Sequence, residues 1–176
     1  MFVWIGLSLE NELFNLTQKI IKYSNDNNII TPLKDLPIHV SLRMSFEIEK
    51  KDFNNIEGEL TQFSSSLSPF KINFKYIEAN NNIIWIKCEE TNELLKAHDT
   101  VCNILKDKFN VPLHAFDKEF VFHSTLFMDD PCKIQSNIDN INKINLPDCV
   151  LSNTVLIGTS ESGEPGTYKI YKTIII

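Results

Sequence analysis

The chain has 176 residues, 43% of them hydrophobic, and a formal net charge of −6 at pH 7. This length and apolar content predict a single domain over residues 1–176 with a substantial core. The negative charge argues against a basic face that binds long nucleic acid, so a phosphate-bearing partner is expected to be a nucleotide or a short RNA end. No apolar run is long enough to span a bilayer, so no membrane partner is expected.

The amino terminus and the cysteines bear on the compartment. Residues 1–5 lack the basic leader of a secretory signal and run directly into a strand-like pattern. The four cysteines include no C-x-x-C pair, so buried reduced thiols are expected rather than a metal cluster or a redox dithiol. Together these features predict a cytoplasmic protein. We also expect a monomer without a metal or other cofactor.

The first 37 residues predict a strand, a helix and a loop. Residues 2–9 alternate between two faces, as a strand does. Residues 10–25 carry apolar side chains at helical spacing, among them Leu13 and Leu16. Residues 25–37 are rich in Asn and Pro and are expected to form a loop.

The first of two histidine motifs follows this loop, at residues 39–42 (His-Val-Ser-Leu). Every second residue is apolar through Ile48, and the residues between them are polar. This period of two predicts a strand with one face on the core and one face in water. Since residues two apart in a strand point to the same side, His39, Ser41 and Arg43 are expected to share the wet face.

The middle of the chain predicts a helix, a hairpin and another helix. Residues 52–67 have helical character, with Asp52 as a candidate cap. Residues 70–78 and 83–88 are expected to pair as strands across an Asn-rich turn. Residues 91–109 then predict a helix with an apolar stripe.

The second motif, residues 123–126 (His-Ser-Thr-Leu), also lies in a strand-like segment. Phe122 belongs to its apolar side, whereas His123, Thr125 and Phe127 are expected on the other side. Each motif therefore projects an imidazole and a hydroxyl from one surface. A histidine alone on a strand is most simply a surface residue, but the matched pair favours a shared site that moves protons around a phosphate.

The remaining segments complete the fold prediction. Residues 130–144 predict a short helix, and residues 148–158 and 167–175 predict two strands joined by a glycine-rich turn. The whole pattern predicts an α+β fold with two lobes related by a pseudo-two-fold axis and an interleaved chain. Antiparallel sheets would line a central cleft with helices outside, and each lobe would contribute one motif.

The motifs resemble the paired H-x-[ST]-hydrophobic signatures of the two-histidine (2H) phosphoesterase superfamily, and in particular its LigT-like, or 2′-5′ RNA ligase, group. Residues 83–86 with the helix after them, and residues 163–168 with their glycines and tyrosine, also look like that family. The resemblance covers essentially the whole chain. Family members often have a proline before each histidine, where this chain has Ile38 and Phe122, and an arginine after the second motif, where it has Phe127 and Met128.

The resemblance implies metal-independent cleavage of a phosphodiester, often a 2′,3′-cyclic phosphate at an RNA end. It implies His123 as the base and His39 as the acid, leaving a 2′-phosphate, although the two roles exchange with the orientation of the substrate. Ser41 and Thr125 would donate hydrogen bonds to the non-bridging phosphoryl oxygens. The same groups serve the alternatives, which are a 2′-5′ phosphodiesterase and a 2′-5′ RNA ligase.

Further residues are candidates for binding. Arg43 is the only arginine, and a guanidinium binds phosphate with two hydrogen bonds, although a surface ion pair is an equal alternative. Four aromatic residues on expected non-core faces are candidates for stacking a nucleobase, although strand aromatics more often serve packing: Trp4, Trp85, Tyr168 and Phe127.

The other polar candidates carry weaker predictions. His98 lies on the apolar stripe of its helix and is expected to be structural, and His114 is expected in a solvated loop. Asp117 or Lys118 is a candidate for orienting substrate.

Three rival functions remain open at this point. A zinc hydrolase built on the motif histidines needs three or more converging ligands, and the sequence has no H-E-x-x-H spacing. A non-catalytic nucleotide or RNA-end binding module would not need two titratable groups. A nucleophilic cysteine enzyme is disfavoured because no cysteine adjoins a histidine in the sequence.

Overall fold

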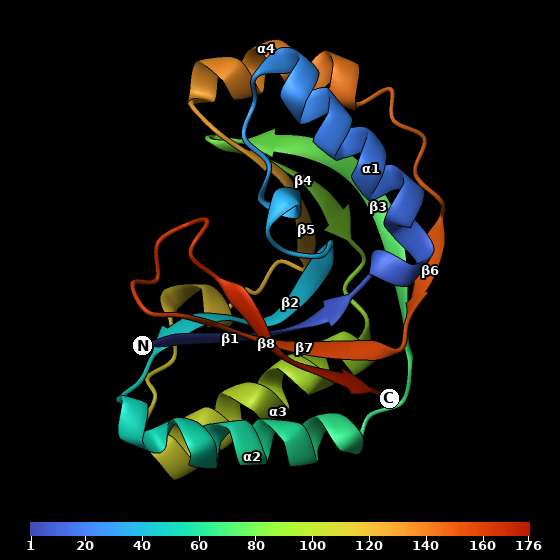
Figure 1. The fold of residues 1–176 in the computed structure, drawn as a ribbon. Coiled ribbons are helices and arrows are strands. Elements are labelled where there is room, and N and C mark those ends of the chain that lie inside the picture. Colours follow the sequence, from blue (N-terminus) through green and yellow to red (C-terminus); the bar gives the residue numbers. More distant parts are fainter.

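The computed structural model describes residues 1–176 and contains two antiparallel sheets with helices on the outside (Figure 1). The strands and α-helices are, in chain order, β1 (Phe2–Ser8), α1 (Glu10–Asn27), β2 (His39–Glu47), α2 (Phe53–Ser65), β3 (Phe70–Asn80), β4 (Ile83–Cys88), α3 (Asn92–Phe109), β5 (His123–Met128), α4 (Pro131–Ile141), β6 (Cys149–Ser152), β7 (Thr154–Ser160) and β8 (Lys169–Ile175). Three short 3₁₀-helices are η1 (Pro32–Lys34), η2 (Lys50–Asp52) and η3 (Ala115–Asp117).

Each of the two sheets has four strands, with a motif strand at one edge. The first sheet is β2-β1-β7-β8 and the second is β5-β4-β3-β6, with every pairing antiparallel. Each motif strand forms an edge of its sheet, and the two edges, β2 and β5, contact one another (Figure 1). The predicted α+β class with antiparallel sheets and outer helices is confirmed.

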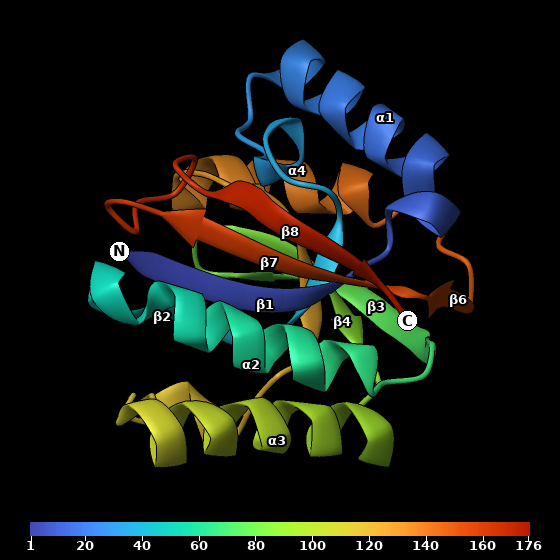
Figure 2. The ribbon, with the colours of Figure 1, turned by 60° about the horizontal axis from the view of Figure 1, so that its bottom comes forward.

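The helices cross between the halves. Helices α2 and α3 cover the first sheet, whereas α1 and α4 cover the second (Figure 2). Thus α1 follows a strand of the first sheet but packs on the second, and α3 does the reverse. A single hydrophobic core joins the halves, including Ile5 and Leu42 from the first sheet and Ile86 and Leu126 from the second. None of the helices combines the length and apolar character needed to cross a membrane.

The prediction of one strand over residues 148–158 is wrong. The chain leaves the second sheet after β6 and enters the first sheet with β7, so Asn153 is the crossing point. Ser152 Oγ donates to the Ser8 carbonyl at 2.8 Å, and the Ile176 amide donates to the Asn153 carbonyl at 2.9 Å, which holds this crossing in place. Three consecutive polar residues, Ser152, Asn153 and Thr154, interrupt the apolar pattern here, and such a cluster indicates a break that the single-strand prediction did not take into account.

Local sequence signals explain how the strands and helices that carry the site begin. The Thr91 hydroxyl accepts a hydrogen bond from the Leu94 amide at 3.2 Å and so caps α3, as Thr commonly does at a helix N-terminus. The hairpin between β3 and β4 turns at Asn81, which has a φ of 53°, a conformation that Asn tolerates better than most residues. Asp52 precedes α2 but makes no capping hydrogen bond with its side chain.

Candidate active site

The first motif strand contains a β-bulge at its leucine. Gly6 of β1 pairs with Ser41, but the preceding residue Ile5 pairs with Arg43, so Leu42 is an extra residue in β2. Because paired residues share a side and Ile5 and Gly6 point to opposite sides, Arg43 points away from the side of Ser41. The prediction that Arg43 shares the face of the motif histidine and hydroxyl is therefore wrong.

The second motif strand contains a bulge at the equivalent leucine. Trp85 of β4 pairs with Thr125, whereas Ile84 pairs with Phe127, so Leu126 is the extra residue in β5. Phe127 is consequently turned into the core, where its exposed fraction is 0%. The prediction that Phe127 lies beside the motif histidine as a stacking residue is also wrong, for the same physical reason.

Each bulge carbonyl is held by a side chain from elsewhere in the chain. His98 Nδ1 donates to the Leu42 carbonyl at 2.7 Å, and Thr31 Oγ1 donates to the Leu126 carbonyl at 2.6 Å. A bulge disrupts the ladder locally, and a buried carbonyl left without a partner is costly. His98 precedes the second motif and Thr31 precedes the first, so each half stabilises the bulge of the other.

The two motif histidines have the same hydrogen-bonded arrangement. His39 Nδ1 donates to the Pro37 carbonyl at 2.8 Å, and His123 Nδ1 donates to the Val121 carbonyl at 2.7 Å. A carbonyl oxygen only accepts, so each neutral ring carries its proton on Nδ1 and keeps a lone pair on Nε2. Neither Nε2 is bonded to a protein group, and neither are the motif hydroxyls. Both nitrogens are therefore free to exchange protons with a bound molecule.

A tryptophan ring packs against each motif histidine. Trp4 stacks on His39 with ring centroids 4.5 Å apart, and the Trp85 ring lies 4.2 Å from that of His123. Trp85 is half-buried, and its Nε1 donates to Glu78 Oε1 at 2.9 Å. Trp4 is only 5% exposed, so its ring supports the histidine and leaves little surface for a nucleobase.

Burial lowers the pKa of both histidines below the ordinary value of 6.5. For His39 the largest cause is burial; the hydrogen bond to Pro37 opposes it, and the nearby His123 lowers the pKa further. For His123 burial is again the largest cause, opposed by the hydrogen bond to Val121. The strands that carry the two rings, β2 and β5, contact one another, and both rings are mainly neutral at pH 7.

Arg43 is committed to an internal ion pair. Its Nη2 lies 3.0 Å from Asp117 Oδ2, and the side chains of both residues are no more than 2% exposed. It also donates to the Pro112 carbonyl at 3.3 Å. Arg43 is therefore a structural residue that joins β2 to the loop before β5, and Asp117 is engaged in the same pair.

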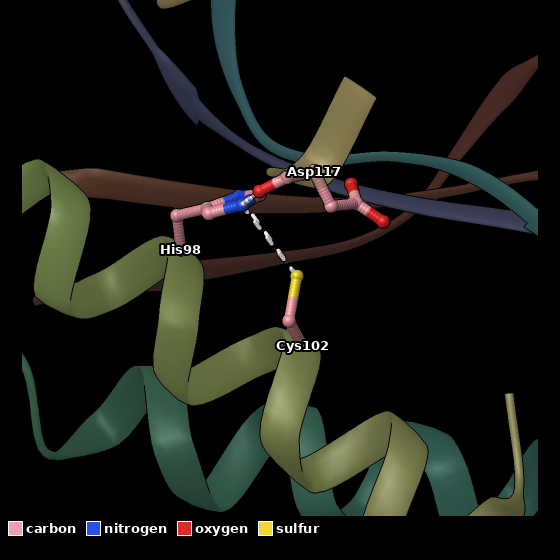
Figure 3. Close-up of side chains that lie close together, drawn as sticks. All are labelled: His98, Cys102 and Asp117. Carbon is pink, nitrogen blue, oxygen red and sulfur yellow. Dashed lines mark hydrogen bonds between the residues drawn. The ribbon is translucent and has the colours of Figure 1, made fainter. Parts of the chain in front are cut away.

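A buried cluster of His98, Cys102 and Asp117 has the composition of a metal site (Figure 3). Most of its candidate ligand atoms already have protein partners, however, whereas Asp117 Oδ1 has none. Both His98 ring nitrogens face backbone carbonyls, with Nε2 3.2 Å from that of Asp117, while the Asp117 carboxylate binds Arg43. Burial raises the pKa of the Cys102 thiol to about 11, which disfavours the thiolate that a metal needs. This cluster connects α3 to β2 and η3.

The remaining sequence candidates lie apart from the histidine pair. The Tyr168 hydroxyl bonds to Ser45 Oγ at 2.5 Å and to the Gly163 carbonyl at 3.2 Å, so it ties the loop before β8 to β2. His114 is exposed and caps η3 through Nδ1, and Lys118 is exposed nearby.

A cavity of about 730 Å³ is also elsewhere. It lies between the end of α2, the start of β3 and the start of α3, and residues such as Pro69 and Lys96 line it. It contains neither motif nor any histidine, so the candidate site rests on the paired side chains.

Sequence reasoning missed Lys87, which lies directly opposite His123, and Tyr76, which lies directly opposite Lys87. The signal was available, because Lys87 is two residues after Trp85 and therefore points to the same side of β4.

Comparison with known proteins shows the family of the chain. Residues 20–143, which include both motifs, match the model of the 2′-5′ RNA ligase superfamily. The chain belongs to this superfamily. A predicted phosphoesterase of Bacillus licheniformis is 31% identical over 85 residues, which are 46% of this chain and 48% of the relative. The match thus spans about half the length of that curated relative.

Solved structures share the fold of this superfamily member over almost its full length. The protein TT0787 of Thermus thermophilus has a TM-score of 0.64 at 13% identity, covering 99% of this chain and 97% of its own. E. coli LigT complexed with 3′-AMP has a TM-score of 0.61 at 11% identity, with 99% and 96% covered. Kluyveromyces marxianus Usb1 has a TM-score of 0.53 at 11% identity, with 99% and 98% covered. At these identities the likeness establishes the fold alone.

Proposed function

We propose that this superfamily member is a metal-independent phosphodiesterase that hydrolyses the 2′,3′-cyclic phosphate of an RNA end or nucleotide to a 2′-phosphate. The observation that carries the proposal is the matched pair of histidines. Both rings have Nδ1 fixed by a carbonyl and Nε2 free, and the two strands that carry them contact one another. Two such groups are what in-line displacement at phosphorus requires, one at the attacking and one at the leaving oxygen.

The proposed step balances with groups of this chain and one water molecule. His123 Nε2 accepts a proton from water, whose oxygen forms the new bond to phosphorus. The bond from phosphorus to O3′ breaks, and protonated His39 donates its proton to that oxygen. The Ser41 and Thr125 hydroxyls donate to the non-bridging oxygens, where negative charge accumulates.

The proton inventory of the pair fits this mechanism. Both pKa values lie below 6.5, so at neutral pH the base is already deprotonated. The acid must be protonated, and an anionic phosphodiester between the rings favours the protonated form of one of them. Binding of the substrate therefore prepares the pair as one base and one acid.

The comparisons support a nucleotide substrate. E. coli LigT has been crystallised with 3′-AMP, NADP⁺ and ATP, and the Bacillus licheniformis relative is a predicted phosphoesterase. The superfamily name also supports the alternative ligase reaction, in which a 5′-hydroxyl takes the place of water, the bond from phosphorus to O3′ breaks and a 2′-5′ linkage forms.

Hydrolysis of 2′,3′-cyclic nucleotides and of a short RNA with a cyclic phosphate end, in the presence of EDTA, tests the proposal. We expect turnover by the wild type and a fall in kcat of about 10²–10⁴-fold in both His39→Ala and His123→Ala. His114→Ala, an exposed histidine away from the pair, is the matched control and retains activity. NMR of the product identifies the oxygen that leaves.

Loss of turnover in EDTA with recovery on adding zinc would overturn the metal-independent mechanism. Absence of turnover on every cyclic phosphate, with cleavage or formation of a 2′-5′ linkage instead, would assign the alternative activity. Binding of nucleotides with no reaction on any of these substrates would make the protein a binding module.

A further inference from the structure

One face of the second sheet carries a row of side chains that ends at His123. Lys87 of β4 lies directly opposite His123, and Tyr76 of β3 lies directly opposite Lys87. Because neighbouring strands are about 4.8 Å apart, the row extends about 10 Å from the histidine. Trp85 and Glu78 form the adjacent row on the same face.

The side chains of this row are accessible and only loosely engaged. Tyr76 is 47% exposed, and the Lys87 side chain is 32% exposed. Lys87 Nζ lies 5.7 Å from the centroid of the Tyr76 ring and 4.0 Å from Glu78 Oε1. That carboxylate oxygen already accepts a hydrogen bond from Trp85 at 2.9 Å. The ammonium group of Lys87 therefore keeps donors for an anion, beside an exposed aromatic ring.

The first sheet has no comparable surface beside its histidine. The residue directly opposite His39 is Ser8, where the second sheet has Lys87. The one arginine of the first half is buried with Asp117. The combination of an aromatic ring and a cation is thus confined to the His123 side of the site.

We propose that Tyr76 and Lys87 form a subsite for a second nucleotide of the substrate. Tyr76 stacks on the base, and Lys87 binds the phosphate of that unit. A nucleotide presents these two groups together, at a distance from the reacting phosphate that a neighbouring unit covers. The inference rests on the proposed function and names its substrate class: an RNA end of at least two nucleotides, read with little base preference because stacking tolerates any base.

Kinetics on two substrates test the subsite. The ratio of kcat/KM for a dinucleotide ending in a 2′,3′-cyclic phosphate to kcat/KM for the cyclic mononucleotide is about 10 or more in the wild type. It falls about 10-fold in Tyr76→Ala and in Lys87→Gln. Tyr171→Ala, an exposed tyrosine on β8, and Lys71→Gln, an exposed lysine on β3, are the matched controls and keep the wild-type ratio.

The outcomes separate the subsite from the proposed function. Turnover of both substrates with a ratio that neither variant changes overturns the subsite and leaves the phosphodiesterase intact. Turnover of neither substrate overturns the proposed function, and calorimetric titration with a 2′-deoxy dinucleotide 3′-phosphate then decides the subsite. Binding of that ligand that weakens about 10-fold in Tyr76→Ala supports the subsite; binding that does not weaken, or no binding, overturns it.

Discussion

Each sheet places a tryptophan against its motif histidine, but in a different way. In the first sheet the Trp4 ring passes over Gly6 to reach His39, whereas in the second sheet Trp85 lies in the strand next to His123 and contacts it directly. Gly6 lies opposite Ser41, and Trp85 itself lies opposite Thr125, so the tryptophans come from different register positions. A methyl group on Gly6 would lie 2.9 Å from Trp4 Cζ3, which shows that the indole crosses directly over this glycine. The same ring contact is thus built in two ways.

Comparing the surroundings of the two histidines separates the features that both halves have from those that only one half has. Common to both are the free Nε2, the hydroxyl two residues later, the bulge at the leucine and a donor to the bulge carbonyl. In the proposed function, these features hold the proton-exchanging atoms against the phosphate of the substrate. The features that differ lie around them. Beside His39 there is a buried tryptophan, Trp4, whereas beside His123 there is an accessible sheet face with Lys87 and Tyr76. We infer that the shared features serve the chemistry and the differing ones distinguish the two ends of the substrate.

The largest expected effects compare the residues that the two bulges turn inward. Arg43→Ala should lower the free energy of unfolding by about 3–5 kcal/mol, because it leaves the Asp117 carboxylate buried without its partner. Phe127→Ala should cost about 3–5 kcal/mol through the lost packing of a fully buried ring. Urea unfolding of both variants gives these values.

A double substitution tests whether the unpaired carboxylate causes the loss of stability in Arg43→Ala. Asp117→Leu combined with Arg43→Met should recover most of the stability lost in Arg43→Ala, because a buried pair replaced by apolar side chains leaves no unpaired charge. If Arg43→Ala instead keeps its stability and raises KM, Arg43 binds phosphate. The bulge at Leu42 would then not turn its next residue inward as the bulge at Leu126 does.

These two residues also show how far the sequence reaches. Strand periodicity correctly predicts both motif strands and the side of each motif histidine and hydroxyl, because a period of two holds as long as the ladder is regular. It fails one residue later in each strand, at Leu42 and at Leu126, where an inserted residue reverses the parity. A bulge has no distinct composition here, so Arg43 and Phe127 are misplaced together.

The crossing at Asn153 was missed for a related reason. It depends on hydrogen bonds from Ser152 and Ile176 to distant parts of the chain, and local periodicity does not register such contacts. The motifs themselves carry enough chemistry for the family and the histidine pair to be anticipated. The neighbours that distinguish the two sides, such as Lys87, require the register of the sheet.

A smaller effect is expected where the first half depends on glycine. A Cβ at Gly158 would overlap the Trp4 indole, so Gly158→Ala must displace the ring from His39. We expect a loss of about 1–3 kcal/mol in unfolding free energy together with a lower kcat. Gly58→Ala is the matched control, since nothing lies within 4 Å of its added methyl, and alanine in a helix should stabilise α2 by about 0.5–1 kcal/mol. Unchanged activity in Gly158→Ala would show that the Trp4 contact is dispensable.

The smallest expected effect is the pH dependence that the histidine pair imposes on stability. Both histidines have a lower pKa in the folded protein than the ordinary 6.5 of an unfolded chain. Well above pH 6.5 both histidines are neutral in the folded and in the unfolded state, and the pair does not alter stability. As the pH falls below 6.5 the unfolded chain takes up protons first, so the free energy of unfolding decreases until the folded-state pKa values are passed. His39→Gln should therefore lose less unfolding free energy than the wild type when the pH falls from about 7.5 to about 5, a range that includes the ordinary histidine pKa of about 6.5. Urea unfolding at the two pH values measures this difference.

The coupling between the halves has its own signature. His123→Gln removes the charge that repels a proton on His39, so the pKa of His39 should rise, while burial still keeps it below 6.5. An NMR titration of the His39 ring protons in the wild type and in the variant measures this shift directly. If the His39 titration curve is the same in the variant, the charge on His123 does not affect the pKa of His39. The two motifs would then act as separate sites rather than as one acid-base pair.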